Sequence, residues 1–460
     1  MLRRLLAGWN RFVKAQSGNV SVIFGLAFLP MVLFMGSAID YSRAAQQRAR
    51  LDNAADSAAL AGVNWSIKNN LNPPSSDQIK SYFYAMAGTS DVTINDVTVT
   101  TSTSVTSVFV TVNYTASVKT SFMQAGGFQT ITVGGSATSA ADKPKYVNFY
   151  LMLDNSPSMG LGATSADIAK LQSLTPDSCA FACHMHTFNS SGQITGDNTS
   201  DYYHIAKNNG VQTRIDVLRT ATQNLAQSAN DAIQITNQFK MAVYTFSDVV
   251  TTISTLSTNL INGSPNVKTL AGNIDLAYAY YDQRDTQTSF DTALSTLNSA
   301  MPTPGDGSSS LLASEFLFIV TDGVQDQPVG SKSGTGDKAD TIATNSTYFP
   351  PSGVTTLPNL YSAKSGNVSS ARLISVMDTS TCTTIKNRNI RIAVLYTPYL
   401  PVTNNSFYNS WVAPISSSIP TQLQACASPG FYFQITPTQG INEAMQAMFK
   451  AALSAARITQ

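Results

Sequence analysis

The sequence predicts an α/β fold, a doubly wound and mostly parallel sheet that is preceded by a transmembrane helix and a small α+β module. Three observations support this order. Residues 20–39 contain no charged side chain, and within residues 92–118 Val alternates with Thr or Ser. From residue 143 onward, short apolar runs alternate with stretches of helical periodicity. Such alternation is typical of a parallel sheet with helices on both faces.

The N-terminal residues 1–19 form a basic tail ahead of the apolar span. Basic side chains occur from Arg3 to Lys14, and no acidic residue occurs before Asp40. At a rise of about 1.5 Å per residue, residues 20–39 measure about 30 Å, which matches the hydrocarbon core of a bilayer. Because basic flanks stay in the cytoplasm, we expect a single-pass protein of the cell membrane with its C-terminal domain outside the cytoplasm.

A cleavable signal peptide is the alternative interpretation of this span. The apolar stretch is longer than the usual signal sequence, and Gly36-Ser37-Ala38 offers only a weak cleavage site. We therefore favour an uncleaved anchor.

Helix-forming residues continue through residues 40–62, so we expect one extended helix that leaves the membrane and ends at Gly62. Residues 63–142 are predicted to form the small α+β module, because their Val and Thr alternation has the period of half-buried strands. The polar residues 136–143 are interpreted as a linker. Hydroxyl-lined strands favour edge pairing, so a homo-oligomer is a candidate assembly.

Two apolar runs in residues 143–460 each end in a carboxylate. The first runs into Asp154-x-Ser156-x-Ser158, and the second runs into Thr321-Asp322-Gly323. The carboxyl ends of neighbouring parallel strands face one crevice, so we expect these groups to meet. An isolated pentad of this kind is more often a helix N-cap, but the preceding strands favour a metal site.

A third loop, rich in hydroxyls, leads from residue 285 into a helical pattern. Its Thr288 is the candidate third hydroxyl, with Thr286, Thr303 and Ser308 as neighbouring alternatives. Oxygen ligands in a compact shell suit Mg²⁺. The predicted metal ligands are Asp154, Ser156, Ser158, Thr288 and Asp322.

In this order the three loops resemble the von Willebrand factor A domain and its metal-ion-dependent adhesion site. The resemblance covers residues 143–460. It implies that the hydroxyls of Ser156, Ser158 and Thr288 bind Mg²⁺, or Mn²⁺ or Ca²⁺, while Asp154 and Asp322 bind directly or through water. It also implies that the open metal position takes an acidic residue of a protein partner.

The N-terminal part resembles pilus-assembly proteins of the tight-adherence (Tad, or Flp) system, specifically the TadG type. The resemblance rests on residues 17–25, on Asp40-Tyr41-Ser42-Arg43 and on residues 51–61. Similar pseudopilins carry a Glu five residues after the processing glycine, whereas Ile23 stands at that distance from Gly18. Prepilin-type cleavage is therefore not expected.

The two resemblances together imply a membrane-anchored, metal-dependent protein-binding component of Tad-type pilus assembly or anchoring. Its partner would be a pilus or envelope component. The alternative is an envelope adhesin, unrelated to pili, that binds a host or matrix protein through the same metal site.

The chain has four cysteines, and for an outward-facing domain we expect them to form disulfides. The favoured pairing is Cys179 with Cys183 and Cys382 with Cys426. Zinc binding near His184 and His186 is the less favoured alternative, because a zinc site needs four well-spaced ligands.

Composition and motifs argue against other classes of function. The net charge is only +1, with 12% charged residues, so nothing indicates a nucleic-acid surface. The sequence has no nucleophile elbow, no His-Glu-x-x-His helix and no phosphate-binding glycine loop, so we do not expect an enzyme. Two long segments, residues 161–209 and 325–369, exceed what the fold needs and are expected to project around the metal.

Overall fold

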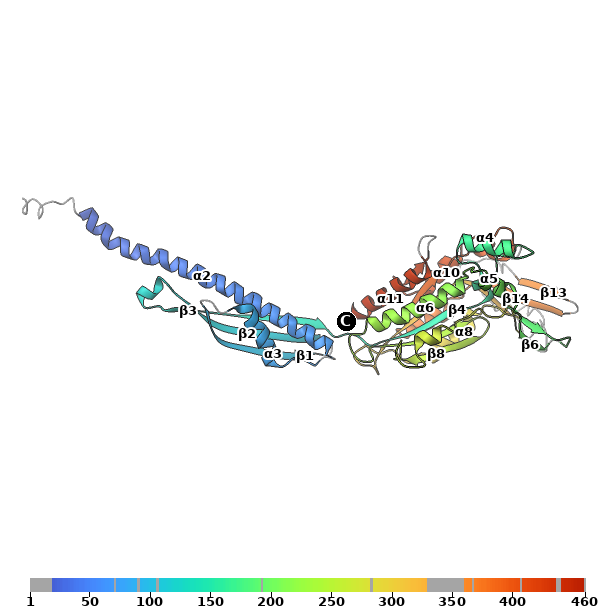
Figure 1. The fold of residues 1–460 in the computed structure, drawn as a ribbon, viewed down its shortest axis with the longest axis horizontal. Helices are drawn as coiled ribbons and strands as arrows, with labels where there is room; N and C mark the ends of the chain where they lie inside the picture. The colour runs from blue at the N-terminus through green and yellow to red at the C-terminus, as the bar shows by residue number, and fades with distance from the viewer. Residues whose placement is uncertain are drawn as a thin grey trace, which may run out of the picture. The chain divides into compact units, whose positions relative to one another are not determined.

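The computed structural model divides the chain into two compact units, Met1–Lys143 and Pro144–Gln460 (Figure 1). Part of the second long segment, residues 329–359, lies outside the described residues, so its predicted place around the metal stays a prediction. The described residues are 19–69, 72–88, 92–104, 107–191, 193–281, 284–328, 360–365, 368–405, 408–435 and 440–458.

The first unit begins with one long helix, α2 (Asn19–Lys68), which includes Pro30. By length and composition this helix is able to cross a membrane, with a mean hydropathy of 2.3 in its most apolar window. Its apolar side chains stay uncovered through the predicted span, since Phe24 is 65% exposed and Phe34 is 76% exposed. Exposed aromatic side chains are expected of a helix that contacts lipid.

The prediction that this helix ends at Gly62 is wrong, because α2 continues to Lys68. The glycine has a packing role instead. A Cβ atom at position 62 would lie 3.1 Å from the side chains of Ile79 and Val110. A glycine at this position therefore allows the neighbouring helix and strand to approach α2 closely, whereas a larger residue would push the two side chains aside.

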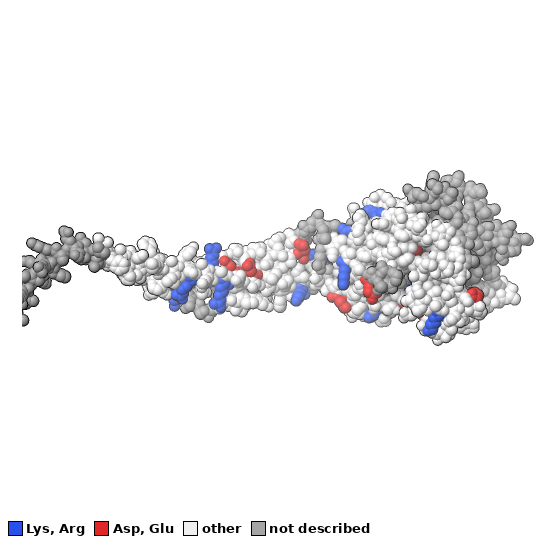
Figure 2. All heavy atoms as spheres, turned by 90° about the horizontal axis from the view of Figure 1, so that it is seen from above, with Lys and Arg blue, Asp and Glu red and all other residues white. Residues whose placement is uncertain are grey.

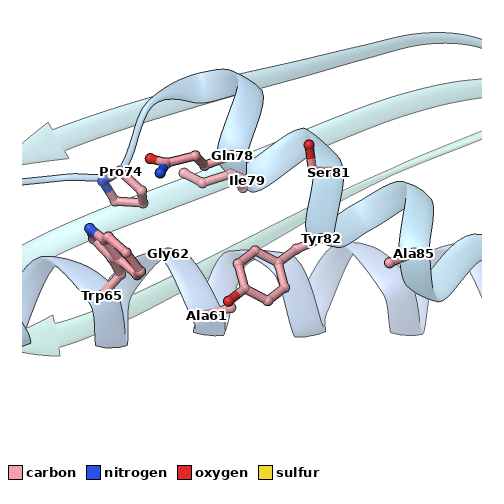
Figure 3. A pocket seen from close by; sticks show the side chains of 9 residues that line it. All are labelled: Ala61, Gly62, Trp65, Pro74, Gln78, Ile79, Ser81, Tyr82 and Ala85. Atoms are coloured by element: carbon pink, nitrogen blue, oxygen red, sulfur yellow. The ribbon is translucent and has the colours of Figure 1, made fainter.

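A second helix, α3 (Ser76–Ala87), packs on α2 and begins at a capping box formed by Ser75 and Gln78. The two helices border an open, mostly apolar pocket of about 380 Å³ (Figure 3). The ring of Trp65 lines this pocket from α2, and the ring of Tyr82 lines it from α3.

Three antiparallel strands complete the unit: β1 (Val92–Thr103), β2 (Ser107–Lys119) and β3 (Thr130–Asp142). The prediction of a linker over residues 136–143 is wrong, because β3 pairs with β2 as far as Asp142. Ala137 in this stretch is only 7% exposed, so burial of alternate residues maintains the strand.

The helix and the sheet of this unit are also joined through Asp40. Its carboxylate accepts hydrogen bonds of 2.8–2.9 Å from the backbone N–H groups of Ser121, Phe122 and Met123. These groups lie at the start of the short helix η2 (Met123–Gly126), so the acidic residue next to the predicted span holds the β2–β3 connection against α2.

The second unit is built on a six-stranded sheet in the order β16-β15-β11-β4-β7-β8. All neighbours pair in parallel except β8, which is antiparallel to β7. The strand order reverses between β4 and β11, the position at which open α/β sheets bind ligands. The strands are β4 (Val147–Asp154), β7 (Phe239–Phe246), β8 (Val250–Ser257), β11 (Ser314–Thr321), β15 (Arg391–Tyr396) and β16 (Tyr432–Gln434).

Helices cover both faces of this sheet, which confirms the predicted doubly wound α/β fold. One face, with Phe149 and Leu153, packs against α6 (Arg214–Asp231), α7 (Val267–Ala271) and α11 (Ile441–Ile458). The other face, with Tyr150 and Met152, packs against α8 (Phe290–Ala300), α9 (Ser380–Asn387) and α10 (Ile419–Cys426). The methionines of α11, Met445 and Met448, are fully buried in the first core.

The long segment after β4 is folded rather than irregular. It contains η3 (Pro157–Gly160), α4 (Ser165–Leu174), β5 (His186–Phe188), β6 (Ile194–Asp197) and α5 (Tyr202–Asn208). The other elements of the unit are β9 (Tyr280–Tyr281), β10 (Arg284–Asp285), β12 (Val324–Pro328), β13 (Leu360–Ser365), β14 (Val368–Val376), η4 (Tyr408–Val412) and η5 (Ala413–Ile415).

Candidate metal site

Asp154 and Asp322 lie at the carboxyl ends of β4 and β11, the two parallel strands that flank the reversal of strand order. Leu153 and Val320 are register partners, so the chains leave the sheet side by side. Both aspartates are fully buried. The structure therefore brings the two predicted acidic ligands to one edge of the sheet.

The pentad after β4 forms a continuous chain of hydroxyl contacts. The Ser156 hydroxyl donates to Asp154 Oδ1 at 2.6 Å and lies 2.8 Å from the Ser158 hydroxyl. Thr321, the last residue of β11, donates its hydroxyl to the other oxygen of Asp154 at 2.6 Å. Asp154 is thus held from both strands, which fixes its orientation before any ligand arrives.

The side chains of Ser158 and Tyr399 hydrogen-bond to the carboxylate of Asp322. Its Oδ1 accepts a hydrogen bond from the Val324 N–H at 3.3 Å. Its Oδ2 is buried and accepts no hydrogen bond from the residues that the structure describes. A buried carboxylate oxygen without a donor is costly, so this atom indicates a missing positively charged or hydrogen-bonding group.

The electrostatics of the pair point the same way. Burial raises the pKa of Asp154, and the nearby charge of Asp322 raises it further. Burial also raises the pKa of Asp322, although the positive charge of Arg214 opposes this. Two adjacent buried carboxylates are ionised only if cations compensate them.

Arg214 was not predicted from the sequence as part of the site. It is the first residue of α6 and is 4% exposed, and its guanidinium donates to the carbonyl oxygens of Thr397 and Pro398 at 3.3 and 2.7 Å. Its charge acts on Asp322 and on Asp154, so within the described part of the chain the set has one compensating positive charge for two carboxylates. A capping box of Thr213 and Asp216 begins this helix.

Thr288 lies at the same edge of the sheet but is not joined to the other ligands. Its backbone pairs with Asp326, with N–H to oxygen distances of 2.6 and 2.9 Å, and the next residue, Ser289, donates its N–H to Ser247 at the end of β7. Thr288 is 5% exposed, and among the described residues its hydroxyl bonds to none of the other four predicted ligands. Its role as a ligand stays a prediction.

The residues present fit a hard divalent cation. The set offers serine hydroxyls, two carboxylates and one carboxylate oxygen without a donor, which is the oxygen-only chemistry that Mg²⁺, Mn²⁺ or Ca²⁺ prefers. A cation bound there would satisfy Asp322 Oδ2 and compensate the second carboxylate. The loop itself is fixed by tight packing, since a Cβ at Gly323 would lie 2.4 Å from Ile419 of α10.

The cysteines divide into two different pairs. Cys382 of α9 and Cys426 of α10 are joined by a disulfide with a Cα to Cα distance of 5.2 Å. Cys179 and Cys183 are present as thiols rather than as the expected bridge. The hydrogen bond between them lowers the pKa of Cys179 to about 7, against the effect of burial. The second bridge remains a prediction.

Comparison with known proteins identifies the N-terminal segment. Residues 18–64 match the model of a family described as putative Flp pilus-assembly TadE/G-like proteins. The match covers α2 almost to its end, including the apolar span and Asp40. No curated protein is significantly similar to the chain in sequence.

Solved structures are similar to this chain only at a low level. They include the pilus adhesin SpaC from Lactobacillus rhamnosus GG, with 11% identity and a TM-score of 0.34 over 80% of this chain and 34% of that chain. The von Willebrand factor domain of the type V pili tip protein Mfa5 from Porphyromonas gingivalis has 10% identity and a TM-score of 0.37, covering 69% and 98%. The PilB minor pilin from Streptococcus sanguinis has 13% identity and a TM-score of 0.35, covering 80% and 78%. The chain spans about a third of the length of SpaC, and similarity at this level supports no inference about function.

Proposed function

We propose that this chain is a membrane-anchored, metal-dependent protein-binding component of Tad-type pilus assembly or anchoring. The family match over residues 18–64 supports the link to pilus assembly. The apolar helix α2 supports the anchor, and the edge of the sheet at β4 and β11 supplies the binding site.

The observation that carries the metal-binding part of the proposal is the oxygen Asp322 Oδ2. It is buried, it lacks a hydrogen-bond donor among the described residues, and it belongs to the second of two neighbouring carboxylates. A Mg²⁺ ion bound by Asp154, Ser156, Ser158 and Asp322 would give Asp322 Oδ2 a partner and would also compensate the second negative charge. Thr288 would join this shell from the neighbouring loop.

The proposed partner group is a carboxylate on a pilus or envelope protein. A site with hydroxyls and two carboxylates leaves a divalent cation with residual positive charge, and such an ion attracts an acidic ligand. We place the N-terminal tail in the cytoplasm and the second unit outside it, where such a partner would be met.

We expect binding rather than catalysis at this site. The three histidines of the chain all occur between residues 184 and 204, in the segment after β4. The site itself consists of hydroxyls, carboxylates and the buried guanidinium of Arg214. Among these groups only a carboxylate could act as a general base near neutral pH. The metal would occupy that carboxylate.

Metal-dependent cross-linking in intact cells tests the proposal. Cells that produce the full chain would be treated with a cross-linker in the presence of Mg²⁺, or after chelation and washing. We expect Mg²⁺-dependent adducts with a pilus or envelope protein that an Asp322→Asn variant does not form. Adducts that are equally abundant after chelation and in the variant would contradict metal-dependent binding, and adducts only with host or matrix proteins would favour an adhesin.

A further inference from the structure

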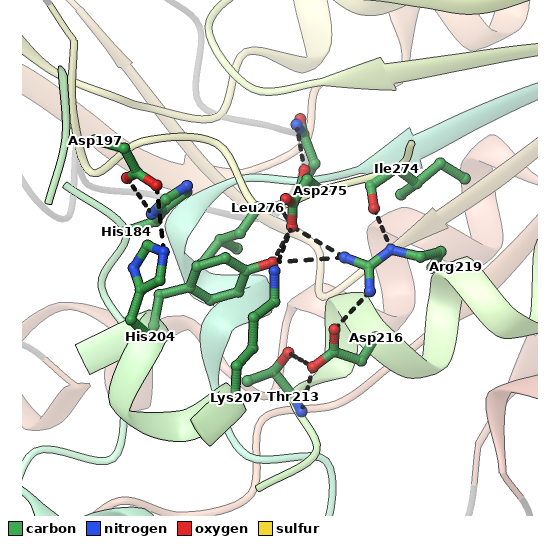
Figure 4. A network of polar contacts seen from close by, with 12 residues as sticks. His184, Asp197, His204, Lys207, Thr213, Asp216, Arg219, Ile274, Asp275 and Leu276 are labelled. Atoms are coloured by element: carbon green, nitrogen blue, oxygen red, sulfur yellow. Dashed lines mark hydrogen bonds and ion pairs between the residues drawn. The ribbon is translucent and has the colours of Figure 1, made fainter. Parts of the chain in front are cut away.

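A second group of potential metal ligands lies in the segment between β4 and α6. It consists of His184 before β5, Asp197 at the end of β6, and Asp201 and His204 at the start of α5. Figure 4 shows His184, Asp197 and His204 of this group side by side. Each residue offers one ligand atom, and these four atoms lie within 4.8 Å of one another. We infer that these four residues form a Zn²⁺ site, separate from the oxygen site at β4 and β11.

The contacts of His204 carry this inference. Its Nδ1 lies 2.8 Å from Asp201 Oδ1, and its Nε2 lies 3.2 Å from Asp197 Oδ2. A neutral imidazole carries a proton on only one of its nitrogens, so one contact would place a lone pair against a carboxylate oxygen. Either a second proton or a cation must lie between these atoms.

The environment favours a cation over a second proton. His184 approaches both carboxylates through one atom, since its Nδ1 lies 3.0 Å from Asp201 Oδ2 and 3.8 Å from Asp197 Oδ1. Two imidazoles therefore share two carboxylates, and one divalent ion matches the charge of the carboxylates while both rings stay neutral. Protons alone would require a second proton on the His204 ring, and that single positive charge would compensate only one of the two carboxylates.

The ligands are also held in place by other groups. Asp201 accepts hydrogen bonds from the N–H groups of Met185 at 2.7 Å and His204 at 2.8 Å, and its side chain is 1% exposed. The His184 ring is stacked on Tyr278 at 4.1 Å, and the His184 carbonyl accepts the Ala279 N–H. Preorganised ligands with neighbours that fix their orientation are a feature of metal sites.

The donor types select the metal. Two imidazole nitrogens with two carboxylate oxygens suit Zn²⁺, which prefers four ligands in a tetrahedron. Ligands at about 2.0–2.1 Å from zinc are about 3.4 Å apart in a tetrahedron. The His184 Nδ1 to Asp201 Oδ2 distance is 3.0 Å and the His204 Nε2 to Asp197 Oδ2 distance is 3.2 Å, and one ligand atom from each residue lies within 4.8 Å of the others, so a modest contraction of the side chains would complete the shell.

A zinc ion here would fix the segment that borders the oxygen site. The strand of chain before His184 pairs with the pentad loop, because Ala182 donates its N–H to Gly160 at 2.9 Å and Phe181 forms a β-bridge with Leu161. The ion would thus connect β5, β6 and α5 to the loop that carries Ser156 and Ser158. All four ligands come from the protein, which is typical of a structural zinc site.

Zinc counting on the full chain in detergent micelles tests the inference. The protein would be dialysed against buffered Zn²⁺ with excess Mg²⁺, and bound zinc would be measured by mass spectrometry of the metal. We expect one zinc per wild-type chain and at least tenfold weaker binding by His204→Ala. Replacement by Co²⁺ should give the visible absorption of a four-coordinate ion, a readout that does not depend on any variant.

Matched variants separate this site from its neighbours. His186→Ala is the control. His186 lies in β5, which pairs with the strand of Asp197, and its ring stacks on Tyr278 at 3.5 Å, but it is outside the cluster. This variant should keep zinc. Asp322→Asn should also keep zinc, so failure of the proposed function would leave this result unchanged. His204→Gln, which keeps a polar side chain, would replace His204→Ala if that variant does not fold.

Several outcomes would overturn the inference. The first is a wild-type chain that binds no zinc, and the second is an equal loss of zinc from the His186 and His204 variants. The third is a loss of zinc from Asp322→Asn alone. The fourth is release of zinc when the Cys179 and Cys183 thiols are alkylated. The last result would assign the ion to the cysteines.

Discussion

Asp154 and Asp322 end the two parallel strands between which the strand order of the sheet reverses, and the charge of Asp322 makes Asp154 harder to ionise. The two residues are 168 positions apart in the sequence, yet Leu153 and Val320 are direct register partners. This arrangement concentrates negative charge at one buried point, so a cation is needed where the two carboxylates meet.

The first prediction concerns Asp322→Asn. This change keeps the size of the side chain and removes its charge, so Mg²⁺ affinity should fall at least tenfold, about 1.4 kcal/mol. Without metal the variant should be no less stable than wild type, because a buried carboxylate oxygen without a donor has been removed. Isothermal titration and urea unfolding with and without Mg²⁺ measure the two effects.

The matched control for this prediction is Asp248→Asn. Asp248 lies in the turn after β7, at the same edge of the sheet, and was not predicted as a ligand. Its replacement should leave Mg²⁺ affinity unchanged. An equal loss in both variants would mean that the effect is general electrostatic attraction rather than coordination by Asp322.

The second prediction is that replacing Arg214 changes Mg²⁺ affinity in the opposite direction. Arg214→Met should destabilise the metal-free protein by about 3 kcal/mol, because the carbonyls of Thr397 and Pro398 lose their donor and the carboxylates lose a compensating charge. Mg²⁺ should bind the variant more tightly and raise its melting temperature more than that of wild type. Thermal unfolding at several Mg²⁺ concentrations tests this, and equal Mg²⁺ shifts in both proteins would contradict it.

These residues also show what the sequence could and could not predict. Asp154, Ser156, Ser158 and Asp322 were identifiable because each follows an apolar run, and strand ends of a parallel sheet meet at one edge. Arg214 was not identifiable, since an arginine at the first position of a helix is ordinarily exposed. Its burial depends on the loop after β15, which packs on it only in the folded sheet.

The same reasoning explains the other differences. Gly62 and residues 136–143 were assigned from local propensity, but packing against Ile79 and pairing with β2 decided their structure. Asp197 and Asp201 carry no local signal for metal binding. They meet His184 and His204 only because β6 turns directly into α5.

The thiols provide the third prediction. In protein isolated from the envelope, peptide mapping without reduction should show Cys382 joined to Cys426. It should also show Cys179 joined to Cys183, because an oxidising compartment converts neighbouring thiols into a bridge. Reduced protein provides the control, and a cross-link between the two pairs would contradict the favoured pairing.

Membrane topology is the fourth prediction. A reporter that is active only outside the cytoplasm should be active when fused after residue 460, because the basic tail holds the N-terminus inside. Replacing the basic residues of the tail by Gln should yield a mixed orientation and lower reporter activity. A second reporter, active only inside the cytoplasm, should be inactive when fused at the same position of the wild-type chain. Full activity of that reporter would refute this topology.

The last prediction concerns Glu315, at the opposite end of β11 from the metal site. Glu315 is 2% exposed, and burial raises the pKa of its carboxyl to about 7, although a hydrogen bond from Asn148 opposes this. The folded protein then holds this proton more tightly than the unfolded chain, so its contribution to stability is full below about pH 4.5 and is lost as the pH rises to about 7. The loss should be on the order of 3 kcal/mol. Glu315→Gln keeps the acceptor for Asn148 but cannot ionise, so its urea stability should fall less than that of wild type between pH 5 and pH 8. The fall that remains comes from groups common to both proteins, such as Asp154. Parallel pH profiles for the two proteins would show that Glu315 ionises without cost, and the explanation by burial would be wrong.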